Sequence, residues 1–80
     1  MIVIDIRSRL DYEKSHIKDS INIDEYELTI NYKNYLRKDK EYLIYCTSGI
    51  RSKRIVNYLK RLGYNVNNLE GGYNNYLLQK

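Results

Sequence analysis

Apolar residues along this chain alternate between short strand-like runs and stretches with helical spacing. β-Branched and aromatic runs predict strands over residues 2–6, 21–23, 42–45 and 65–69. Apolar residues that recur with the period of a helix predict helices over residues 8–15, 24–37, 52–62 and 73–78. Strands that alternate with helices are typical of a parallel α/β sheet. We therefore expect one α/β domain over residues 1–80 with a mostly parallel sheet of about four strands.

Polar and glycine residues at the ends of these elements agree with the pattern. Ser8 is expected to cap the first helix, and Gly63 lies where a helix usually ends on glycine. We interpret Gly71-Gly72 as a plain turn rather than an anion site. We interpret His16, the single histidine, as a structural residue in a turn rather than a general base.

The chain is organised around residues 42–62, which predict a buried strand, a tight loop and an amphipathic helix. Cys46, the only cysteine, follows the strand directly. A loop between the end of a strand and the start of a helix points free backbone N–H groups at one place, where they can bind an anion. Gly49 gives this loop conformational freedom, and Arg51 offers a fork of donors for an oxyanion. Such surroundings lower the pKa of a cysteine thiol.

Two interpretations of Cys46 compete. A single cysteine at the end of a hydrophobic strand is often an inert core residue. Such a residue needs neither Gly49 nor Arg51, so we favour a reactive thiol. The candidate site then comprises a nucleophile, a substrate-binding loop and supporting residues: Cys46; Thr47, Ser48, Gly49, Ile50 and Arg51; and Asp5, Arg7 and Ser52.

Asp5 and Arg7 close the first strand, and side chains at strand ends line the ligand crevice of an α/β sheet. They either reach toward Cys46 or form a structural ion pair.

Three stretches resemble one family. Cys-Thr-Ser-Gly-Ile-Arg-Ser at 46–52 is similar to the Cys-x-x-Gly-x-Arg active-site loop of the rhodanese family of sulfurtransferases. Ile4 to Arg7, with Tyr12-Glu13, His16-Ile17 and Ile21 to Ile23 after it, resembles the first part of that family's pattern. Leu69-Glu70-Gly71-Gly72 resembles its Leu-x-Gly-Gly turn.

The resemblance implies a rhodanese-like three-layer α/β/α fold that lacks the family's usual N-terminal strand and helix. The strand at 65–69 would then lie at an open edge of the sheet, where a second copy could pair to form a homodimer. The resemblance also favours a structural role for Asp5, Arg7 and His16.

The function implied by the resemblance is sulfur transfer. Cys46 would take sulfane sulfur from a small anionic donor, thiosulfate or a persulfide, or from a protein donor. It would carry the sulfur as a persulfide and release it to a thiol or cyanide. No metal or organic cofactor is implied.

Three alternatives stay open. The first is a non-catalytic binding or regulatory module of the same family. The second is a cysteine-dependent phosphatase or arsenate reductase on a similar scaffold, although those enzymes have five residues between cysteine and arginine, against four here. The third is a redox thiol, which would need a thiol from a partner because the chain has no second cysteine.

Composition limits the kinds of partner and the cellular compartment that we expect for this chain. The 80 residues carry a net charge of +4, but the basic residues are dispersed in the sequence among ten acidic ones, which indicates a solvated surface rather than a nucleic-acid site. No apolar run is long enough to predict a membrane helix, and no signal peptide precedes the first strand. The single cysteine excludes an internal disulfide and suits the reducing cytoplasm.

Overall fold

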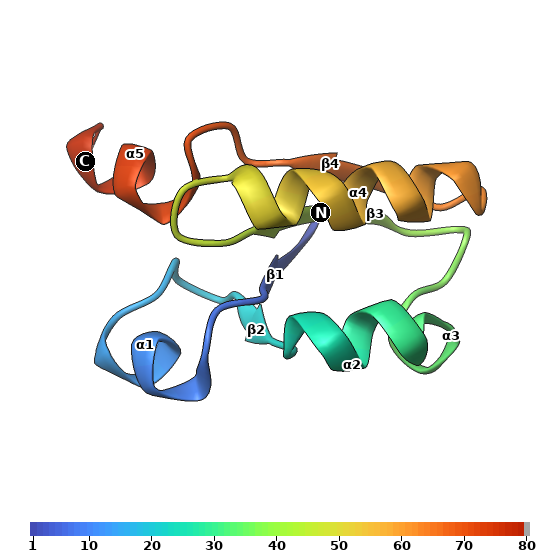
Figure 1. Cartoon of the computed structure of the whole chain (residues 1–80), viewed down its shortest axis with the longest axis horizontal. Helices are drawn as coiled ribbons and strands as arrows, with labels where there is room; N and C mark the ends of the chain where they lie inside the picture. The colour runs from blue at the N-terminus through green and yellow to red at the C-terminus, as the bar shows by residue number, and fades with distance from the viewer. Residues whose placement is uncertain (80) are drawn as a thin grey trace.

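Four parallel strands form one sheet in the computed structural model, which describes residues 1–79 (Figure 1). Neighbouring strands pair in the order β2-β1-β3-β4, and every pair is parallel. The strands are β1 (Ile2–Asp5), β2 (Ile21–Asn22), β3 (Glu41–Tyr45) and β4 (Asn65–Asn68). The predicted parallel α/β sheet is confirmed.

Five helices connect and flank these strands in the described chain: α1 (Arg9–Lys14), α2 (Glu25–Ile30), α3 (Tyr32–Tyr35), α4 (Ile50–Arg61) and α5 (Gly72–Leu78). The single helix expected over residues 24–37 is wrong, because the chain breaks at Asn31 (φ −117°, ψ 33°). The Asn31 amide donates to the Glu27 carbonyl at 2.8 Å, and its side chain donates to the Glu27 carboxylate at 2.6 Å. Both bonds span four residues and belong to α2, so the helix ends at Asn31 itself, a residue type of low helix propensity.

Helix α4 begins two residues earlier than predicted. Gly49 has a left-handed backbone (φ 91°), so the loop reverses there and helical geometry starts at Ile50. At the other end, Gly63 (φ 95°) follows the last turn, which agrees with its predicted place at the end of the helix. Ser8 also caps α1 as expected, since its hydroxyl accepts the Asp11 amide at 3.2 Å.

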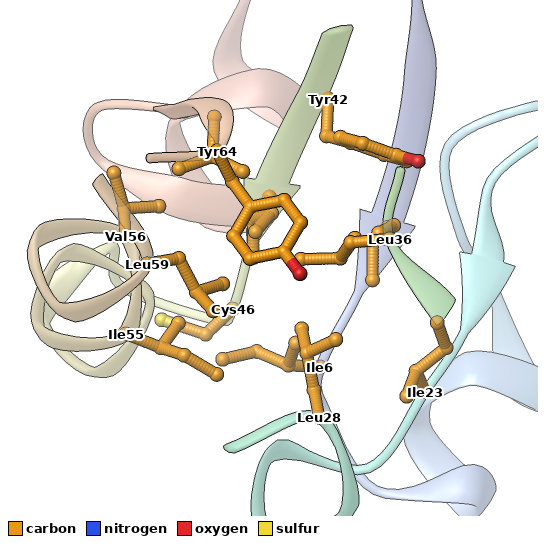
Figure 2. Packing of buried hydrophobic residues seen from close by; sticks show 13 residues of the cluster. Ile6, Ile23, Leu28, Leu36, Tyr42, Cys46, Ile55, Val56, Leu59 and Tyr64 are labelled. Atoms are coloured by element: carbon orange, nitrogen blue, oxygen red, sulfur yellow. The ribbon is translucent and has the colours of Figure 1, made fainter. Parts of the chain in front are cut away.

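The main core lies between one face of the sheet and helices α2 and α4. Alternate strand residues point into it and meet the apolar faces of both helices. These buried residues include Ile4, Ile6, Ile44 and Val66 from or beside the strands, and Leu28, Ile55, Val56 and Leu59 from the helices. Figure 2 shows Cys46 at the edge of this cluster, close to Ile6, Ile55 and Leu59. The core therefore fixes the end of β3 against the start of α4.

The opposite face is held together by a buried ion pair and aromatic rings. Arg7 and Asp5 form a two-pronged pair, with Arg7 Nη2 2.8 Å from Asp5 Oδ2, and Asp5 is fully buried. Arg7 Nη2 also donates to the Ser15 carbonyl at 2.7 Å, and its guanidinium lies 4.2 Å from the centre of the Tyr73 ring. Tyr73 in turn stacks on Tyr45. Helices on both faces give the expected three-layer arrangement.

Strand β4 lies at one end of the strand order, as the sequence predicted for this segment. No further strand pairs with its outer side among residues 1–79. The homodimer expected through this edge stays a prediction. None of the helices that the structure describes is long and apolar enough to cross a membrane.

The buried ion pair leads to a stability prediction. Asp5→Ala leaves Arg7 buried without its counter-charge, so we expect the free energy of unfolding to fall by about 3–5 kcal/mol. Urea denaturation followed by circular dichroism measures this change. The matched control is Asp39→Ala, because Asp39 and Arg37 form the same kind of i, i+2 pair on the surface. Equal effects of the two substitutions would contradict the structural importance of the Asp5–Arg7 pair.

Candidate active site

The Cys46 sulfur lies inside the loop that joins β3 to α4. The Gly49 amide donates to Cys46 Sγ at 3.1 Å, and the Ser52 amide donates to it at 3.4 Å. Both amides belong to the start of α4, where backbone N–H groups have no partner within the helix. The strand–loop–helix geometry expected from the sequence therefore brings backbone donors onto the sulfur.

The side chains of Ser52 and Asn68 form a row of hydrogen bonds that starts at the sulfur. Cys46 Sγ is 3.3 Å from Ser52 Oγ, which donates to Asn68 Oδ1 at 2.5 Å. Asn68 Nδ2 donates to the Gly49 carbonyl at 3.2 Å, which fixes the orientation of the amide. A hydroxyl has one proton. When Cys46 is a thiol its S–H donates to Ser52, and when Cys46 is a thiolate the Ser52 hydroxyl can donate to the sulfur instead.

These contacts control the ionisation of Cys46. Burial raises the pKa of the Cys46 thiol, because the residue is only 2% exposed and a buried charge is poorly solvated. The Ser52 hydroxyl and the amides of Ser52, Gly49 and Ser48 act in the opposite direction by stabilising the thiolate. The donors outweigh burial, so the pKa of Cys46 lies below its ordinary value. An inert core cysteine lacks such a set of donors, which favours the reactive interpretation.

The turn before α5 packs directly on the cysteine loop. The Tyr73 amide donates to the Cys46 carbonyl at 2.9 Å, and the Asn74 amide donates to the Thr47 carbonyl at 3.1 Å. A Cβ atom on Gly72 would lie 2.6 Å from the Cys46 and Thr47 carbonyl oxygens and from the Gly49 nitrogen. The glycine pair is thus more than the plain turn that we expected, because it permits this close approach.

Arg51 lies outside the loop and points to another element. Its Nη2 is 2.6 Å and its Nε 2.8 Å from Glu25 Oε1, at the start of α2, and the Arg51 side chain is 60% exposed. This ion pair raises the pKa of Arg51 and keeps it charged near the site. The other loop residues are Thr47, Ser48 and Ile50, which are all exposed, and Gly49, which is buried.

The remaining candidates have separate places. The described hydrogen bonds and ion pairs of Asp5 and Arg7 hold β1 to its neighbours, and none of them joins Cys46. The His16 ring stacks on Tyr12 with centroids 3.8 Å apart, and its Nδ1 is 2.7 Å from the Tyr12 carbonyl. Both arrangements are typical of structural residues.

Sequence reasoning missed Asn68 and Glu25. The sequence pattern places Asn68 only in the predicted strand over residues 65–69 and Glu25 only in the predicted helix over residues 24–37. No local signal marks either residue, because each acts on a partner 16 or more positions away.

Comparison with known sequences and with solved structures indicates the same family. A sequence model described as the rhodanese-like domain matches residues 1–79. A crystal structure of a rhodanese-related protein from Thermoplasma volcanium superposes with a TM-score of 0.90 at 35% identity, covering 98% of this chain and 77% of the other.

Two curated relatives are much longer than this chain. A tRNA uridine(34) hydroxylase of Legionella pneumophila is 34% identical over 84 residues, which cover 96% of this chain and 33% of the relative. A tRNA sulfurtransferase of Thermoplasma acidophilum is 37% identical over 62 residues, which cover 78% of this chain and 12% of the relative. This chain thus spans about a third or less of their length.

The hydroxyl beside the sulfur gives a reactivity prediction. Ser52→Ala removes a donor from the thiolate but keeps the backbone amide, so the pKa of Cys46 should rise. We expect alkylation by iodoacetamide at pH 7 to slow by about tenfold or more, because a hydrogen bond to a charged group contributes about 1.5–3 kcal/mol. Ser48→Ala, which removes an exposed loop hydroxyl, is the control and should change the rate little. Equal rates for the wild type and Ser52→Ala over the whole pH range would show that the hydroxyl does not stabilise the thiolate.

The glycine contact gives a second prediction. Gly72→Ala places a methyl group against three backbone atoms of the loop at a φ of +63°, so it should lower the melting temperature and displace the loop from Cys46. Thermal melting and the alkylation rate at pH 7 measure the two effects. Gly63→Ala is the control, because its φ is +95° but its nearest neighbour, at 3.1 Å, is the flexible end of Lys38. A larger loss in Gly63→Ala than in Gly72→Ala would refute the role of the close contact.

Proposed function

Because this chain belongs to the rhodanese-like domain family, we propose that it is a sulfurtransferase that carries sulfane sulfur as a persulfide on Cys46. The observation that carries this proposal is the set of hydrogen-bond donors around the Cys46 sulfur. This sulfur belongs to a free cysteine and accepts hydrogen bonds from two backbone amides at the start of a helix. Those donors stabilise negative charge on sulfur, which both the attacking thiolate and the product require.

In the first half-reaction, the Cys46 thiolate attacks the outer sulfur of the donor. With thiosulfate, a new S–S bond forms to Cys46, the sulfur–sulfur bond of thiosulfate breaks, and its electron pair leaves with sulfite. The negative charge then resides on the outer sulfur of the persulfide. Thiosulfate is small, which suits a cysteine that is only 2% exposed.

In the second half-reaction, a nucleophile attacks the outer sulfur. Cyanide leaves as thiocyanate, whereas a thiolate leaves as a persulfide, and in both cases the electron pair of the broken S–S bond returns to Cys46 as the thiolate. The same amide donors serve both halves of the cycle, because the charge lies on sulfur throughout. The cycle needs a free thiol, so we place the protein in the reducing cytoplasm.

The relatives' names set the scope of this proposal. One relative is named a tRNA sulfurtransferase, which accords with sulfur transfer, and others are named tRNA uridine(34) hydroxylases, which names a different reaction. This chain corresponds to only part of each. We therefore propose the sulfur-carrier step, with thiosulfate or a persulfide as donor, and no RNA substrate.

Intact mass spectrometry tests the proposal. We expect the purified chain to gain the mass of one sulfur atom after incubation with thiosulfate or a low-molecular persulfide, and to lose it on addition of cyanide or dithiothreitol. Cys46→Ser should gain nothing, because it lacks the sulfur that attacks the donor. Lys14→Gln, which changes an exposed residue away from the loop, should still gain the sulfur.

No mass gain from either donor, in a chain whose circular dichroism shows it folded, would overturn the proposal. Hydrolysis of p-nitrophenyl phosphate by the same preparation would then favour the phosphatase alternative.

A further inference from the structure

The net positive charge of this protein is concentrated on α4. Five of the 14 basic residues and none of the ten acidic residues lie on this helix. The rest of the chain therefore carries nine basic and ten acidic residues, which nearly balance. The basic residues of α4 are Arg51, Lys53, Arg54, Lys60 and Arg61, and all five are exposed. Basic residues that are dispersed among acidic ones in the whole sequence are thus gathered, without acidic ones, on this helix.

These five basic residues differ in whether they form an ion pair and in where they lie along α4. Arg51 pairs with Glu25, whereas the part of the chain that the structure describes offers no ion pair to the other four. Lys60 and Arg61 lie in the last turn, where the helix dipole favours cations, so helix stability explains them. Lys53 and Arg54 lie near the first turn, where the dipole disfavours cations. Helix stability therefore does not explain these two residues.

Lys53 and Arg54 line a pocket beside the cysteine loop. The pocket has a volume of about 380 Å³ and lies between α4, the loop and the turn before α5. The loop contributes Ser48 and Gly49, and the turn contributes Glu70. Gly49 also donates its amide to the Cys46 sulfur. A partner in this pocket would therefore contact the loop that holds the reactive atom.

The charges and the chemistry together favour one kind of partner. The two cations suit carboxylates, while Glu70 on the facing wall disfavours a chain in which every unit is anionic, such as RNA. A persulfide forms from a donor that carries sulfane sulfur and gives its outer sulfur to a nucleophile, for which a thiolate is well suited. Proteins provide cysteine for this purpose, and unmodified RNA has no thiol.

We propose that Lys53, Arg54 and the adjoining pocket dock an acidic segment of a partner protein, whose cysteine gives sulfur to Cys46 or takes it away. This inference rests on the proposed sulfur-carrier function. The cations hold the segment beside the cysteine loop, so attraction raises the local concentration of the partner cysteine. In the transfer step, the partner thiolate attacks the outer sulfur of the Cys46 persulfide, and Cys46 leaves as the thiolate.

The first experiment measures binding without sulfur chemistry. The probe is a fluorescent short peptide of alternating Glu and Ala around a central Ser, with Gln in place of Glu in the matched neutral peptide. We expect the wild-type chain to bind the acidic peptide at low salt, and Lys53→Gln/Arg54→Gln to bind it about tenfold more weakly. The control Lys14→Gln/Lys18→Gln has the same net charge as the test variant but changes exposed residues away from α4, and should bind like the wild type. Equal weakening by both double variants, or tighter binding of a single-stranded RNA oligonucleotide than of the acidic peptide, would overturn the proposal.

The second experiment measures transfer. The wild-type chain is loaded with sulfur and mixed with the two peptides carrying Cys instead of Ser. We expect faster transfer to the acidic peptide, an advantage that Lys53→Gln/Arg54→Gln removes, while transfer to neutral dithiothreitol stays unchanged in that variant. Equal transfer to both peptides would overturn the docking role. If the chain takes up no sulfur at all, the sulfur-carrier function fails, and the binding experiment shows separately whether the acidic surface preference exists.

Discussion

The hydrogen bonds from the Gly49 and Ser52 amides to the Cys46 sulfur are the interaction on which the rest of the site depends. They require the backbone to turn sharply within four residues, from the end of β3 at Tyr45 to the start of α4 at Ile50. The left-handed conformation of Gly49 makes this turn possible. The close approach at Gly72 then lets the Tyr73 and Asn74 amides hold the turn from the other side by donating to the carbonyls of Cys46 and Thr47. Without both glycines the amides would not point at the sulfur.

The two faces of the sheet hold this junction by different means. On one face, apolar side chains of α4 bury against the strands and anchor the helix start beside β3. On the other face, the Asp5–Arg7 pair and the Tyr45–Tyr73 stack tie α5 and the end of α1 to the sheet. Because α5 begins at Gly72, the second set of contacts also positions the glycine turn. The buried charges therefore serve the site indirectly, by placing backbone rather than by touching the sulfur.

The sequence was most informative where the determinants are local. The order of strands and helices, the cap at Ser8 and the loop around Cys46 follow from residue type and short spacing, and the structure has each of them. The break at Asn31 does not follow from the pattern, because apolar residues continue at helical spacing past it, and only the backbone angles of Asn31 reveal the break. Asn68 and Glu25 were missed for another reason. Their partners lie 16 and 26 residues away, and only the fold brings them together. The visible contacts of Asp5 and Arg7 are structural, and a role of Arg51 in chemistry stays a prediction, since its visible contact is the ion pair with Glu25.

The distribution of charge is a second property that the sequence pattern alone does not predict. Counted along the chain, basic and acidic residues intermingle, and that pattern argued for an ordinary solvated surface. The fold separates them, because α4 contains only basic charges and runs away from the cysteine loop. Cations near the first turn oppose the helix dipole at a small cost in helix stability, which is greatest for Arg51 because the effect falls off beyond that turn. A thiolate at that end of the helix offsets part of this cost, since its negative charge attracts both the dipole and the cations. The pKa of Arg51 shows this coupling: the ion pair with Glu25 raises it most, and the negative charge of Cys46 raises it further.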